Sequence, residues 1–100
     1  MQSRTKRQNL RYSIGGEFEG SELLAFQARK KPETFRGQVK DISDGGFCLL
    51  APRPLEQSIL LQGVLRLAQM PVKIPALVQV RWVNRQPIGQ RYRIGLQYVI

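Results

Sequence analysis

Two short groups of residues have the types and spacing to bind a small anionic ligand. Arg7 and Arg11 stand near the N-terminus with three residues between them, and Asp41, Ser43 and Gly46 follow as Asp-x-Ser-x-x-Gly. An arginine guanidinium donates paired hydrogen bonds to a phosphate or to the O6/N7 edge of guanine. A carboxylate accepts hydrogen bonds from the N1–H and N2–H groups of guanine. Together the groups indicate a split site for a small, doubly charged, guanine-containing ligand.

Each group alone has a simpler interpretation. The arginine spacing also fits a solvated basic arm, and the Asp41–Gly46 group also fits a hairpin turn whose polar side chains bond to local N–H groups. The Ser43 hydroxyl either contacts the ligand or fixes this turn. Gly46 lacks a Cβ, which predicts that a base or phosphate approaches its backbone closely.

The N-terminal part of the chain changes character at Leu10. Residues 1–9 have no periodic apolar pattern and are predicted to form a flexible basic arm, which leaves 10–100 as the folded domain. Apolar residues then alternate from Leu10, so a strand is expected that breaks or bulges at Gly15-Gly16 and continues through Phe18. Residues 22–29 form a second extended run that also suits a short helix.

The remaining sequence consists of short alternating segments separated by glycine and proline. Phe35, Gly37, Val39 and Asp41 share one face of a strand, and Asp44-Gly45-Gly46 is a tight-turn signal that leads into the apolar strand 46–51. Further strands are expected over 59–67, 76–83 and 92–98, with a connection over 70–75 and a loop over 84–89. This pattern favours a small antiparallel barrel or sandwich.

Two side chains of distinctive chemistry are assigned to the core. Cys48 is the only cysteine and lies in an apolar run, which favours a small buried side chain over a nucleophile. Trp82 alternates with Val78 and Val80, which favours core packing over stacking on a ligand base.

Length and composition restrict the class of protein. One hundred residues, 42% of them hydrophobic, make one domain with a modest core. There is no histidine, which removes His-based catalysis and His metal ligands, so neither an enzyme nor a metal or other cofactor is expected. The chain shows no membrane span and no apolar leader, and with a single cysteine it fits the cytoplasm.

The charge of the chain predicts an anionic partner. Sixteen Lys and Arg against seven Asp and Glu give a net charge of +9, and residues 57–100 contain no acid. Such an imbalance fits nucleic acid, a membrane surface or a phosphorylated small molecule. A basic solubilising surface is the alternative for the last part of the chain.

Taken jointly, the arginine pair before the first strand and the Asp-x-Ser-x-x-Gly group in the hairpin resemble the PilZ domain, a bacterial receptor module for cyclic di-GMP. The segment Val80-Arg81-Trp82-Val83 resembles the family's penultimate strand, and 92–98 resembles its Gly-x-x-aromatic ending. The resemblance covers nearly the whole chain. It implies an all-β fold, a six-stranded antiparallel β-barrel that binds the ligand on its outside, with outputs such as motility and biofilm formation.

The resemblance also implies residue roles. Arg7 and Arg11 would clamp guanine edges and phosphates, and Asp41 would read guanine. The family often has arginine where this chain has Lys6, a position associated with binding one or two stacked ligands, so the stoichiometry stays open. Many members continue into a helix, whereas this sequence stops at Ile100.

The expected function is therefore that of a non-catalytic cyclic di-GMP receptor, whose N-terminal arm becomes ordered on the ligand and signals to an attached domain or partner protein. Two alternatives remain. One is a small basic barrel that binds single-stranded nucleic acid, which explains the charge but not the Asp41 turn, and for which few aromatic stacking platforms are evident. The other is a PilZ-like protein-interaction module without ligand.

Overall fold

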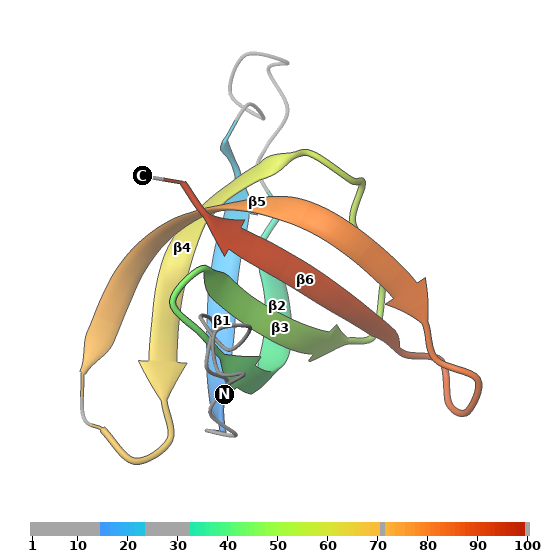
Figure 1. Ribbon diagram of the computed structural model, residues 1–100, viewed down its shortest axis with the longest axis horizontal. Coiled ribbons are helices and arrows are strands. Elements are labelled where there is room, and N and C mark those ends of the chain that lie inside the picture. The colour runs from blue at the N-terminus through green and yellow to red at the C-terminus, as the bar shows by residue number, and fades with distance from the viewer. Residues whose placement is uncertain (1–14, 24–32, 71, 100) are drawn as a thin grey trace, which may run out of the picture.

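The computed structural model describes residues 15–23, 33–70 and 72–99, and these form a closed antiparallel barrel in the order β1-β2-β3-β6-β5-β4 (Figure 1). The barrel has six strands: β1 (Gly16–Glu22), β2 (Phe35–Ile42), β3 (Gly46–Ala51), β4 (Leu60–Leu67), β5 (Lys73–Arg85) and β6 (Tyr92–Tyr98). The predicted all-β, six-stranded barrel is confirmed. Among the described residues, no helix is long and apolar enough to cross a membrane.

The period-two pattern places alternate side chains inside the barrel. On β2, Phe35, Gly37 and Val39 are buried, whereas Arg36 and Gln38 are exposed. The buried hydrophobic side chains form one cluster to which every strand contributes, and no charged or polar side chain of the described residues is buried with them. The aromatic rings of Phe18 and Phe47 meet inside it with centroids 5.3 Å apart.

Gly16 begins β1 and pairs with both neighbouring strands, and a Cβ there would collide with the carbonyl oxygen of Arg66. The predicted break at Gly15-Gly16 concerns a strand from Leu10, and residues 10–14 lie outside the described residues. Two other sequence predictions about strand limits were wrong. The sequence predicted a second extended run over residues 22–29. Glu22 is instead the last residue of β1, and residues 24–29 lie outside the described residues. Finally, β5 begins at Lys73 rather than at 76 and continues to Arg85, so residues 73–75 of the expected connection and the start of the expected loop belong to the strand.

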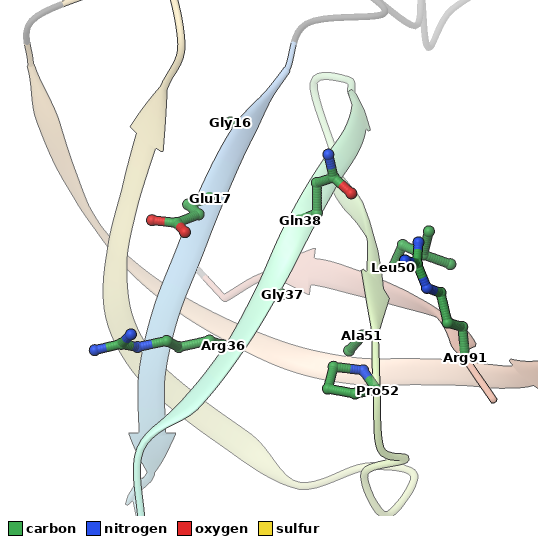
Figure 2. A pocket seen from close by; sticks show the side chains of 9 residues that line it. All are labelled: Gly16, Glu17, Arg36, Gly37, Gln38, Leu50, Ala51, Pro52 and Arg91. Carbon is green, nitrogen blue, oxygen red and sulfur yellow. The ribbon is translucent and has the colours of Figure 1, made fainter. Parts of the chain in front are cut away.

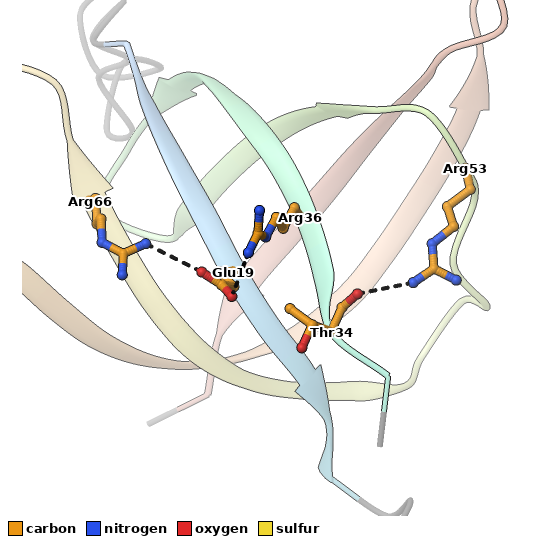
Figure 3. A network of polar contacts seen from close by, with 5 residues as sticks. All are labelled: Glu19, Thr34, Arg36, Arg53 and Arg66. Atoms are coloured by element: carbon orange, nitrogen blue, oxygen red, sulfur yellow. Dashed lines mark hydrogen bonds and ion pairs between the residues drawn. The ribbon is translucent and has the colours of Figure 1, made fainter. Parts of the chain in front are cut away.

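Ion pairs across the outside of the barrel join neighbouring strands. Glu19 on β1 accepts a hydrogen bond from Arg36 on β2 and another from Arg66 on β4, each at 3.4 Å (Figure 3). Arg53 donates to the carboxylate of Glu33 at 3.1 Å and to the carbonyl of Thr34 at 3.3 Å. These contacts tie β1 to both of its neighbours and hold the segment after β3 against the start of β2.

Candidate ligand-binding site

The structure brings together the three predicted site residues that lie within the described part of the chain. Asp41, Ser43 and Gly46 line one hollow at the end of the β2–β3 hairpin. Lys6, Arg7 and Arg11, together with the expected arm over 1–9, lie outside the described residues.

A β-bulge turns Asp41 toward this hollow. Strict alternation along β2 would place Asp41 on the same face as the buried Val39, as the sequence pattern predicted. The register with β3 instead shifts between these residues, so that Val39 pairs with Leu49 and Asp41 pairs with Cys48. An extra residue in one strand reverses which face the following side chains occupy. The bulge therefore moves Asp41 from the core face to the outer face.

A second bulge does the same for Trp82 on β5. The register with β6 shifts between Val80, which pairs with Leu96, and Trp82, which pairs with Gly95. Val80 is fully buried, whereas Trp82 is 37% exposed and lines the same hollow as Asp41. The sequence interpretation of Trp82 as a core residue was therefore wrong, because the bulge at Arg81 ends the alternation on which that interpretation relied.

The two displaced residues occupy the ends of one cross-strand row on the outside of the barrel. Asp41 pairs with Cys48, Cys48 pairs with Gly95, and Gly95 pairs with Trp82, so the row crosses β2, β3, β6 and β5. Directly opposed residues in a sheet point to the same face. Cys48 lies between the inward-facing Phe47 and Leu49 and therefore faces outward, yet it is only 5% exposed. Its burial confirms the sequence prediction.

The turn between β2 and β3 is fixed by local hydrogen bonds. The Ser43 amide donates to the Gly46 carbonyl at 2.8 Å, and the Ser43 hydroxyl donates to the same oxygen at 3.4 Å. A Cβ at Gly46 would overlap the carbonyl oxygen of Leu96 on β6. The neighbouring strand β6 therefore fills the space on the Cβ side of Gly46, which is a structural reason for a glycine there. The close approach of a base or phosphate to its backbone stays a prediction. At Gly45, by contrast, a Cβ would have no atom within 4 Å.

The hollow offers a carboxylate and an indole at opposite ends and a cation beside them. Its volume is about 120 Å³, and Arg81 lines it beside Trp82. Pockets that enclose a drug-sized ligand measure about 300–1,000 Å³, so this hollow can receive only part of such a molecule. Asp41 can accept hydrogen bonds from a ring N–H edge, and the indole can stack on a planar base. Sequence reasoning favoured the core for Trp82 and left Arg81 open between an extension of the anionic site and a solvated basic face, because nothing in the residue pattern marked the bulge.

A larger hollow lies beside this one, over the outer face of β1, β2 and β3 (Figure 2). Its volume is about 500 Å³, and its lining includes Glu17, Arg36, Gln38, Leu50 and Arg91. Gln38 pairs with Leu50 next to the bulge that carries Asp41. The two hollows therefore share the outer surface of the β2–β3 hairpin, and a ligand larger than the first can extend toward the second.

Among the described residues, no group of three or more His, Cys, Asp or Glu side chains lies close enough to hold a metal ion. The chemistry available is hydrogen bonding, charge pairing and stacking.

This arrangement agrees with the comparison against protein families, in which the model of the PilZ domain matches residues 3–100. The chain belongs to the PilZ domain family. A comparison with curated protein sequences finds no match.

Solved structures support the PilZ fold. The complex of Klebsiella pneumoniae MrkH with c-di-GMP matches with a TM-score of 0.72 and 24% identity, covering 100% of this chain and 46% of that one. The Bacillus subtilis inhibitor of motility MotI/DgrA matches at 0.70 and 18%, covering 100% and 48%. The PilZ domain of Escherichia coli YcgR with c-di-GMP matches at 0.67 and 14%, covering 95% and 79%. The chain thus spans less than half of the MrkH and MotI chains.

Proposed function

We propose that this PilZ domain is a receptor for cyclic di-GMP. The observation that carries the proposal is the row from Asp41 to Trp82, in which two bulges turn a carboxylate and an indole from the core onto one face. A carboxylate and an aromatic plane are the two groups that distinguish and hold a guanine base. Two solved relatives of the same fold, the YcgR PilZ domain and MrkH, contain c-di-GMP.

In the proposed complex, Asp41 accepts hydrogen bonds from the N1–H and N2–H edge of one guanine, and Trp82 stacks against a base. Arg81 lines the same hollow and contributes positive charge near the phosphates. The rest of the dinucleotide extends over the neighbouring surface, where Arg91 and Gln38 lie. Ser43 acts mainly by shaping the turn, as its bonds to Gly46 indicate.

Lys6, Arg7 and Arg11 complete the proposed site from the N-terminal segment. Arginine forks bind the phosphates and guanine O6/N7 edges that the barrel leaves open. Fixing the backbone costs about 1–2 kcal/mol per residue, which several charge-assisted bonds of about 1.5–3 kcal/mol each offset. The ordered segment then presents a new surface to an attached domain or partner protein.

Isothermal titration calorimetry with cyclic di-GMP tests this function. Asp41→Asn and Arg11→Ala are each expected to weaken binding about 10- to 100-fold, the loss of one charge-assisted hydrogen bond or more. Asp44→Asn is the matched control, because Asp44 lies exposed in the same turn and outside the hollow. Absence of heat with the unchanged protein at tens of micromolar would leave the ligand-free interaction module as the better description.

Specificity provides a second, independent test. Cyclic di-AMP has the same phosphates, but adenine lacks the N1–H donor that Asp41 would accept, so it is expected to bind far more weakly. Trp82 is the only tryptophan, so quenching of its emission by cyclic di-GMP reports stacking directly. Equal binding of both dinucleotides, or of a single-stranded oligonucleotide with a steep salt dependence, would instead support the nucleic-acid alternative.

A further inference from the structure

The hairpin between β5 and β6 ends in an apolar residue that the barrel leaves in solvent. Ile88 is 86% exposed, more than any other large hydrophobic side chain in the described ranges. In the direction of this hairpin, β4 pairs with β5 only as far as Gln79. On the other side, β3 pairs with β6 only as far as Tyr92. The hairpin beyond these positions therefore projects from the barrel (Figure 1).

The tip of this hairpin has a defined shape. The Gln86 amide donates to the Arg91 carbonyl at 2.9 Å, which closes the loop between the strands. Gly89 has a φ of 74°, a left-handed conformation that glycine adopts without strain. These features hold Ile88 at the apex.

Cations surround the apex. Arg85, Arg91 and Arg93 are all exposed, and Arg85 and Arg93 lie on the paired strands directly below the loop. No Asp or Glu occurs anywhere in residues 57–100. The hairpin tip thus combines an aliphatic apex with a collar of arginines that no acid in its own half of the sequence neutralises.

We propose that this tip binds an anionic lipid surface. Ile88 enters the boundary between headgroups and acyl chains, and the three arginines contact lipid phosphates. Interfacial binding requires an apolar apex and nearby cations, with each Lys or Arg near an anionic surface strengthening attachment about fivefold.

A protein partner fits the tip less well than a membrane does. Stable protein interfaces bury about 800 Å² on each partner and rely on aromatic anchors in fitted pockets. The tip offers one aliphatic side chain and no aromatic residue between Arg85 and Arg91. Ile88, Arg85 and Arg93 line neither of the two hollows, so substituting them tests the lipid proposal separately from dinucleotide binding, whereas Arg91 borders the larger hollow.

Co-sedimentation with vesicles tests the proposal without any dinucleotide. The full chain is expected to bind vesicles of phosphatidylglycerol and phosphatidylcholine at low salt, and to bind phosphatidylcholine vesicles at least tenfold more weakly. Ile88→Ser should reduce binding several-fold. The double variant Arg85→Ser/Arg93→Ser should reduce it about 25-fold, since each arginine contributes about fivefold.

Two controls separate the tip from general charge and apolarity. Val99, 39% exposed, lies just past the opposite end of β6, and Lys73 begins β5 at its far end. Val99→Ser should leave vesicle binding unchanged, and Lys73→Ser should change it by less than either tip arginine. Equal losses in the controls, or unchanged binding by Ile88→Ser, would overturn insertion of the tip.

Fluorescence gives a readout of depth. In a Trp82→Phe background, Ile88→Trp places the sole tryptophan at the apex, and its emission should shift to the blue with anionic vesicles only. No shift would overturn the proposal. Tip variants that lose binding to a single-stranded oligonucleotide while retaining binding to vesicles would overturn it in favour of nucleic acid.

Discussion

The indole of Trp82 occupies the space that a side chain at position 95 would need. A Cβ on Gly95 would overlap the atoms of the indole, and the two residues are cross-strand partners on β5 and β6. Glycine at 95 therefore lets the indole lie close against β6, beside the buried Cys48. The position of Trp82 over the candidate site depends on this absence of a side chain.

Gly95→Ala is therefore expected to displace the indole and to destabilise the fold by about 1–3 kcal/mol, the usual cost of inserting a group into packed space. Urea unfolding measures this change. Gly45→Ala is the matched control, because a Cβ there meets no atom within 4 Å and the residue is exposed. An equal effect of both substitutions would show that backbone freedom, rather than the indole, requires the glycine at 95.

The sequence predicted the barrel well because its strands are short and alternate regularly. The hairpin that contains Asp41 and Ser43 and the final strand were both placed correctly. The same regularity gave the wrong face for Asp41 and Trp82, since each follows a β-bulge. A bulge adds one residue without changing residue type, so the alternation rule places every later side chain on the wrong face. Asp41 and Trp82, two members of the candidate site, are such exceptions, and only the register reveals the face on which they lie.

Glu19 provides a test of the electrostatic contribution to the barrel. Its carboxylate is one-third exposed and accepts hydrogen bonds from Arg36 and Arg66 on the two neighbouring strands. Glu19→Gln is expected to reduce stability by about 0.5–1 kcal/mol at low salt, and by less at high salt because solvent ions screen exposed pairs.

Glu17→Gln makes the same charge change at the next outward-facing position of β1 and is the control. Glu17 forms no ion pair with any residue in the described ranges. Its substitution should change the urea midpoint little. A difference between the two variants that stays constant with salt would mean that packing, rather than charge, accounts for the effect.

Pro75 lies in the part of β5 that has one partner strand among those described. It pairs with Val64 on β4, whereas β6 pairs with β5 only from Val78 onward. The Leu77 carbonyl accepts a bond from the Val99 amide on the side away from β4. Because residues two apart in a strand direct their polar groups to the same side, the missing N–H of Pro75 falls on the edge that no described strand pairs with.

Restoring that donor should make the edge competent for pairing between molecules. Pro75→Thr is expected to produce concentration-dependent dimers or larger species, detectable by light scattering after gel filtration, because a flat edge strand pairs readily with another chain. Pro87→Thr is the control, because Pro87 lies in an exposed turn rather than in a strand. This variant should remain as monodisperse as the unchanged protein. Equal association of both variants would exclude the edge as the cause.

Tyr98 predicts how stability depends on pH in the alkaline range. Its ring packs against Phe47 with centroids 5.8 Å apart, and burial raises the pKa of its phenol above the ordinary value of 10.0. Burial favours the neutral phenol, so the unfolded chain releases this proton at a lower pH than the folded one. The contribution of Tyr98 is thus complete below about pH 10 and is lost as the pH rises through the folded-state pKa. Tyr98→Phe removes this loss and leaves every other residue unchanged. Thermal unfolding from about pH 8 to 11 should therefore show the midpoint of the unchanged protein falling more steeply than that of the variant, and parallel profiles would contradict the raised pKa.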